Sequence, residues 1–254
     1  MNKKFRECCS QKNIFKAFFI IFIFLFSAKA IADTVNYFEV KSILLDPVFN
    51  TKERWRVSAF EPNIEYYKEI PAKICFERLS ESDQQTCFYS EVVTNHKTYR
   101  CQFVKKLSPI FLLKNQVYSK AIIFTAEYSM GGSGSLELIT LWSYNKKKNS
   151  FVNLLPPVAI TNQGEYQFFT DLKENIGCLF ITADYIGGEN ETHFSPHRYL
   201  IKIYKYDLKR NKFRFIDKYE TKAKYKSLND VDEISVIKFE KKKIINKIFL
   251  KKGR

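Results

Sequence analysis

The sequence is poor in glycine, proline and histidine: its 254 residues include only 8 Gly, 7 Pro and 3 His. So few Gly and Pro exclude collagen-like and low-complexity disordered proteins. No apolar run is long enough for a polytopic membrane protein. Arg is also scarce, because only 9 of the 42 basic residues are Arg. Since Arg reads phosphates and bases with its bidentate fork, this bias predicts no nucleic-acid partner.

Familiar catalytic motifs are missing as well. The sequence contains no C-x-x-C, G-x-S-x-G or H-E-x-x-H, and the Gly-rich stretch at residues 131–135 lacks the Lys-Ser/Thr of a P-loop. The sequence shows no motif for a catalytic nucleophile with its base and none for a cofactor. The favoured interpretation is therefore a non-enzymatic binding or structural module with no cofactor.

The N-terminus predicts export. A basic start precedes the apolar run Ala17 to Phe26, and small residues follow as far as Ala32. This is the pattern of a cleaved secretory signal peptide at residues 1–32, with cleavage before Asp33. The protein is then periplasmic or secreted, and its partner is an unknown envelope or extracellular ligand. An uncleaved, short and tilted membrane anchor is the alternative.

Four cysteines lie beyond the signal segment, an even number in a compartment where disulfides persist. The segments around Cys75 and Cys87 flank a polar loop and predict a hairpin that brings these two residues opposite each other. We therefore expect a disulfide between Cys75 and Cys87 and, by exclusion, a second one between Cys101 and Cys178. The absence of a C-x-x-C spacing disfavours a zinc site.

Short apolar segments rich in Val, Ile, Phe, Tyr and Thr predict a mainly β protein. No Gly/Ser or Pro linker interrupts residues 33–254, so we expect one mostly-β domain there. Strands are predicted at residues 54–60, 72–77, 87–93, 99–104, 121–128, 136–144, 151–159, 166–170, 178–185, 199–206, 213–219 and 233–239.

An internal repeat relates residues 121–159 to residues 178–219. The strand that begins at Ala121 aligns with the strand that begins at Cys178, and Gly-Gly follows each of them. The later Tyr144-Asn-Lys-Lys-Lys-Asn-Ser-Phe aligns with Tyr206-Asp-Leu-Lys-Arg-Asn-Lys-Phe. The pattern predicts a duplicated antiparallel β-meander with disulfides, either propeller-like or a β-sandwich.

The second copy is longer, and its extra residues fall in the polar loop 187–197. This loop holds two histidines beside several acids, and imidazole and carboxylate together suit a divalent metal ion. The alternative is a solvated hairpin loop in which His197 packs at the start of the next strand. As an exposed loop, it should tolerate loss of both histidines at a cost of less than about 1 kcal/mol. The candidate ligands are Asp184, Glu189, Glu191, His193 and His197.

Two acids occupy matched positions in the repeat, Glu127 and Asp184, each at a strand end before a Gly loop. Two carboxylates at one rim could perform general acid/base catalysis, as in glycoside hydrolysis. The alternative function is therefore a metal-dependent or carboxylate-based hydrolase with its site in the 184–197 loop. A simpler interpretation is that each acid accepts hydrogen bonds from loop amides.

The tail at residues 240–254 is strongly basic. Its isoleucines at positions 244, 245 and 248 and Phe249 would share one face of a helix surrounded by lysines. Such a helix could bind an anionic membrane surface. The favoured alternative is a closing strand followed by a frayed end, because the apolar stripe covers barely two turns.

Overall fold

The computed structural model describes most of the chain beyond the predicted signal peptide, which lies outside the described residues. It is mainly β, as the sequence predicts, and the strands of each sheet are antiparallel. No helix in this part of the chain is long and apolar enough to cross a membrane. The described residues are 36–45, 53–63, 70–80, 85–94, 96–114, 117–131, 134–161, 163–171, 177–188, 191–192, 195–226 and 235–252.

In the described part of the chain, three antiparallel meanders of four strands follow one another, and a fifth strand joins the second of them. We call them the first sheet (β1–β4), the middle sheet (β7–β10, with β11 also paired to β9) and the last sheet (β12–β15). A two-stranded hairpin, β5–β6, connects the first sheet to the middle one. The elements are β1 (Tyr37–Leu45), β2 (Trp55–Pro62), β3 (Lys73–Arg78), β4 (Gln85–Tyr89), β5 (Glu91–Thr94), β6 (Lys97–Arg100), β7 (Phe103–Lys114), β8 (Val117–Gly131), β9 (Gly134–Asn145), β10 (Ser150–Asn153), β11 (Val158–Thr161), β12 (Glu165–Asp171), β13 (Gly177–Ile186), β14 (Arg198–Asp207), β15 (Lys212–Glu220) and α2 (Val236–Lys252).

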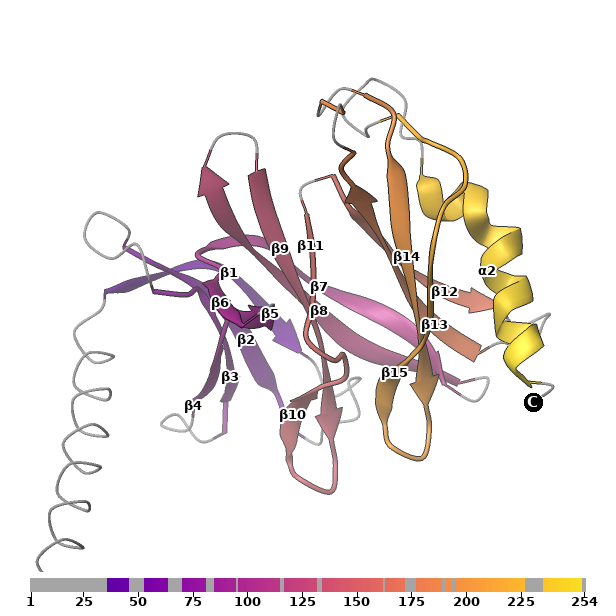
Figure 1. Ribbon diagram of the computed structural model, residues 1–254. Helices are drawn as coiled ribbons and strands as arrows, with labels where there is room; N and C mark the ends of the chain where they lie inside the picture. The colour runs from indigo at the N-terminus through magenta and orange to yellow at the C-terminus, as the bar shows by residue number, and fades with distance from the viewer. Residues whose placement is uncertain are drawn as a thin grey trace, which may run out of the picture.

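The three sheets stack in chain order, and α2 covers the outer face of the last sheet (Figure 1). Each interface between layers has its own apolar cluster. The first and middle sheets meet through residues such as Phe76 and Phe124, and the middle and last sheets meet through Ile123 and Phe180. The third cluster joins the last sheet to α2 around Ile244.

Runs that are apolar except for Thr125 and Thr182 explain why β8 and β13 lie inside this stack. Every residue of Ala121–Ala126 and of Cys178–Ala183 is buried. A strand with one solvent-exposed face alternates apolar and polar residues, whereas a strand that is buried on both faces does not need this alternation. Full burial of one Ile, Leu or Phe side chain contributes about 1.5–3 kcal/mol, so these two strands stabilise both of their interfaces.

The predicted repeat corresponds to two copies of the same strand–turn–strand geometry. In the β9–β10 turn the Tyr144 hydroxyl donates to the side chain of Asn149, and in the β14–β15 turn Tyr206 donates to Asn211. Both asparagines have positive φ, 48° and 51°, which Asn tolerates better than most residues. The sequence similarity therefore marks matched turn chemistry.

Cysteine pairing was predicted correctly for one bridge and wrongly for the other. The disulfide Cys75–Cys87 joins residues directly opposite each other on β3 and β4. Cys101 and Cys178 form no disulfide, because they lie in the clusters on opposite sides of the middle sheet. Burial raises the pKa of the Cys101 thiol to about 12, so this group stays protonated at neutral pH.

The tail is helical, which corrects both the favoured closing strand and the strand predicted at residues 233–239. The apolar stripe of α2 begins at Val236 and Ile237, which precede the basic tail at residues 240–254. The side chain of Ser235 accepts a hydrogen bond from the amide of Lys238, and the carboxylate of Glu165 accepts one from Ile237. These acceptors cap amides that have no partner within the helix.

Candidate functional site

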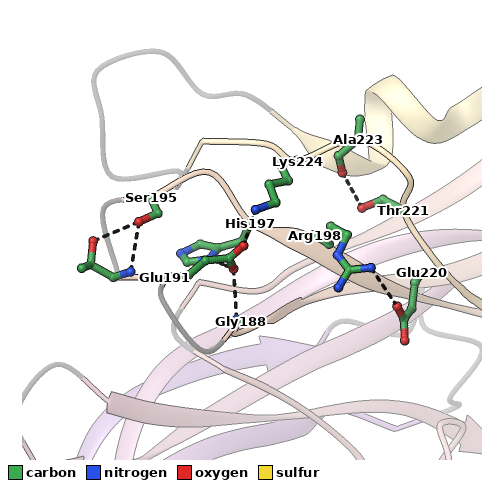
Figure 2. A network of polar contacts seen from close by, with 10 residues as sticks. Gly188, Glu191, Ser195, His197, Arg198, Glu220, Thr221, Ala223 and Lys224 are labelled. Carbon is green, nitrogen blue, oxygen red and sulfur yellow. Dashed lines mark hydrogen bonds and ion pairs between the residues drawn. The ribbon is translucent and has the colours of Figure 1, made fainter.

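The predicted loop site contains a polar network around the buried His197, just before β14 (Figure 2). The residue is only 1% exposed, and two backbone hydrogen bonds of 2.7 Å pair it with Tyr225. Its Nδ1 lies 3.0 Å from Oε2 of Glu191. The other carboxylate oxygen, Oε1, lies 2.6 Å from Nζ of Lys224, and the amide of Gly188 donates to Oε2 at 3.1 Å.

This network fixes the charge of Glu191. Its hydrogen bonds with Lys224 and His197 lower the pKa of the carboxyl to about 2, so it is ionised at neutral pH. On the imidazole, Nε2 is buried and has no hydrogen-bond partner among the residues that the structure describes. Among the described residues, the imidazole therefore joins the network through Nδ1 alone.

The structure brings together only part of the predicted metal set. Glu191 and His197 are in contact, whereas Glu189 and His193 lie outside the described residues. The Oδ1 of Asp184 accepts from the amide of Thr161 at 3.0 Å and from its hydroxyl at 2.6 Å. Within the described ranges no three His, Cys, Asp or Glu side chains form a group that could hold a metal. The expectation of an exposed loop position is wrong for His197.

The two predicted catalytic carboxylates belong to different sheets. Glu127 lies on β8 of the middle sheet, where Oε2 is 2.7 Å from Nζ of Lys105. Burial raises the pKa of this carboxyl, but hydrogen bonds from Lys105 and Ser135 outweigh burial and lower it overall. Asp184 lies on β13 of the last sheet, and its bonds to Thr161 tie that sheet to β11. Each acid therefore accepts hydrogen bonds within the fold, but the donors at Glu127 are the side chains of Lys105 and Ser135 and not the loop amides of the simpler interpretation.

Sequence reasoning missed a second polar cluster, which fastens α2 to the last sheet. The carboxylate of Glu240 accepts from the hydroxyls of Tyr219 at 2.9 Å and Tyr225 at 2.8 Å. Burial is the main cause that raises the pKa of both tyrosines, and the hydrogen bond to the Glu240 carboxylate is the second. The pKa of Tyr225 rises to about 12 and that of Tyr219 rises still further. Lys247 adds an ion pair of 3.2 Å to Asp217. No sequence spacing indicates this cluster, because its members come from three separate segments.

Comparison with known proteins adds little. No family model and no curated protein matches the chain. A solved structure titled "Crystal structure of CarG" is similar with a TM-score of 0.35 and 14% identity, over 51% of this chain and 94% of that chain. A similarity this weak carries no argument about function.

An aromatic hollow of about 80 Å³ opens between the first and middle sheets. Ligand pockets usually measure about 300–1,000 Å³, so this hollow is small for a substrate site. It contains no His, Asp or Glu. Its lining residues are Trp55, Phe76, Arg78, Thr86, Phe88, Asn149, Ser150 and Phe151.

Proposed function

We propose that the protein is an exported, non-enzymatic binding or structural module of the cell envelope or extracellular space. The observation that supports this proposal is that the side chains best suited to chemistry are engaged within the fold. Asp184 ties the last sheet to β11, Glu191 holds His197 and Lys224 together, and Glu127 binds Lys105. A general acid or base must instead face a cavity where a substrate can reach it.

Export is supported by two independent features. The first is the signal-peptide pattern at residues 1–32. The second is the disulfide Cys75–Cys87, since such bonds persist mainly in oxidising compartments. The intact mass of the natively expressed protein tests export directly. We expect a chain that begins at Asp33, and a chain that retains residues 1–32 in the membrane fraction would contradict the proposal.

One observation favours the alternative, a metal-dependent hydrolase with its site in the 184–197 loop. The carboxylate–imidazole pair of Glu191 and His197 resembles the arrangement that orients a metal-binding histidine, and Nε2 of His197 has no hydrogen-bond partner among the described residues. The two functions differ in one measurable property, the metal content of the folded protein.

The experiment compares the purified mature protein with His197→Asn and with a control, His96→Asn. His96 is exposed in a turn and has a positive φ of 62°, which Asn accepts. Bound metal is measured by mass spectrometry after equilibration with zinc or manganese and dialysis. We expect far less than one metal per chain in all three proteins. One metal per chain that is lost in His197→Asn and retained in His96→Asn would overturn the proposal.

A further inference from the structure

The outward face of α2 carries apolar as well as basic side chains. Phe239 is 67% exposed and Phe249 is 42% exposed, although the helix already buries Ile244 and Ile248 against the last sheet. A helix that only covers a sheet needs one apolar face. Phe239 stacks on the ring of Tyr225, with the ring centroids 6.0 Å apart, but it is still 67% exposed, so packing within the fold accounts for only part of this second aromatic group.

Helix geometry places these two phenylalanines on the same side. Successive residues advance by about 100°, so the buried positions define an inward direction, and Phe239 and Phe249 both lie within about 50° of the opposite direction. They are separated along the axis by roughly 15 Å, at 1.5 Å per residue. Lys238 and Lys242 share this outward face and are exposed.

The contacts on the other side of α2 keep this face turned outward. Glu240 is bound by two tyrosine hydroxyls, and Lys247 is paired with Asp217 of β15. Lys243 is paired with Glu240 at 3.4 Å and lies over the ring of Tyr219. The inward-facing charges are thus neutralised within the fold.

The remaining charge is strongly positive. The α2 sequence contains seven Lys and one Glu, a net charge of +6, and it has no acid in its first turn. Lys238 and Lys242 on the outward face are exposed and form no ion pair with any described residue. Lys241 is also exposed, but it lies on the flank of the helix, 5.7 Å above the ring of Phe169. Exposed cations beside exposed aromatic rings, on a helix of net charge +6, are complementary to a surface that is anionic outside and apolar within.

We propose that the outward face of α2 docks the protein on an anionic lipid surface, with the helix axis parallel to the membrane plane. This inference names a partner for the binding module proposed above and rests on that function. Lysines without arginines suit diffuse attraction to lipid headgroups, and the exposed rings can enter the boundary between headgroups and acyl chains. A partner that recognises charge alone would make no use of the two phenylalanines.

The test is co-sedimentation of the mature protein with vesicles, either of phosphatidylcholine alone or with 30 mol% phosphatidylglycerol. We expect binding only to the anionic vesicles, weakened at least tenfold when NaCl rises from 50 to 500 mM, because salt screens surface charge. Lys238→Gln with Lys242→Gln should reduce partitioning at least tenfold. The matched control neutralises two exposed lysines of the β9–β10 turn, Lys146 and Lys147, and should change partitioning less than twofold.

The aromatic contribution is tested separately. Phe239→Ser with Phe249→Ser should reduce vesicle binding at least fivefold and leave binding to soluble heparin unchanged. Its control is Phe111→Ser, which removes an exposed ring from β7. Circular dichroism verifies that each variant is folded, and if the phenylalanine variant unfolds, the lysine variants decide.

Absence of binding to anionic vesicles, or equal effects of the helix and turn lysines, would refute the lipid surface. Phenylalanine variants that bind vesicles as well as the wild type would point to a polyanionic partner instead and would also refute it. Either result would refute lipid docking but would not affect the proposed function as an exported binding module. That function is refuted only by bound metal that is lost in His197→Asn, or by a protein that retains residues 1–32.

Discussion

Replacement of Glu240 by Ala should weaken the attachment of α2 to the last sheet. Glu240 is nearly buried, and its carboxylate accepts hydrogen bonds from Tyr219 and Tyr225. A hydrogen bond to a charged group contributes about 1.5–3 kcal/mol, so the two bonds together contribute at most about 6 kcal/mol. The cost of removing the carboxylate from water offsets part of this. Both tyrosines are partly exposed and can turn to water, so we expect the free energy of unfolding to fall by about 2–3 kcal/mol.

The assay combines urea denaturation with amide hydrogen exchange. In Glu240→Ala, the amides of α2 should lose protection while those of β8 in the middle sheet keep it, because local opening need not unfold the core. Lys242→Ala is the matched control, since it changes an exposed residue of the same helix that lies away from the tyrosines. A loss below about 0.5 kcal/mol in Glu240→Ala, equal to that of the control, would refute the reasoning.

Two further predictions concern pH and the cysteines. The pKa of Glu191 is about 2 in the folded protein and about 4.3 when unfolded, so its contribution to stability is present above pH 4.3 and is lost as pH falls toward 2. Acid denaturation of Glu191→Gln should show a weaker pH dependence over this range, and an identical profile would count against the network. For the cysteines, loss of the Cys75–Cys87 bridge should cost about 3 kcal/mol for its short loop. Alkylation should label Cys101 and Cys178 only after denaturation, and peptide mapping that links these two would contradict the fold.

Much of the fold could be predicted because local sequence patterns encode it. The mainly apolar segments of β8 and β13 indicate strands buried on both faces. The β9–β10 and β14–β15 turns share a sequence pattern that begins with Tyr and Asn or Asp and ends with Asn and Phe, and this pattern indicates the same turn twice. The hairpin around Cys75 and Cys87 is also a local feature, so its disulfide is confirmed. Strand β1 was missed, since its side chains are mostly exposed and carry no alternating apolar pattern.

The wrong predictions depend on contacts between distant segments. Counting an even number of cysteines cannot show that the middle sheet separates Cys101 from Cys178. The apolar stripe of α2 is completed by residues before the basic tail, so the tail alone resembled a strand. His197 is buried because Tyr225, far along the chain, pairs with its backbone.

The central claim is that the acidic and histidine side chains that could perform catalysis instead stabilise the fold. The free energy of unfolding of His197→Asn tests this claim most directly. Because the imidazole is buried and bonded to Glu191, we predict a loss of at least about 1 kcal/mol relative to wild type, while the exposed control His96→Asn changes stability by less than about 0.5 kcal/mol. Equal stability of the two variants would show that His197 is not held for structure and would contradict the account.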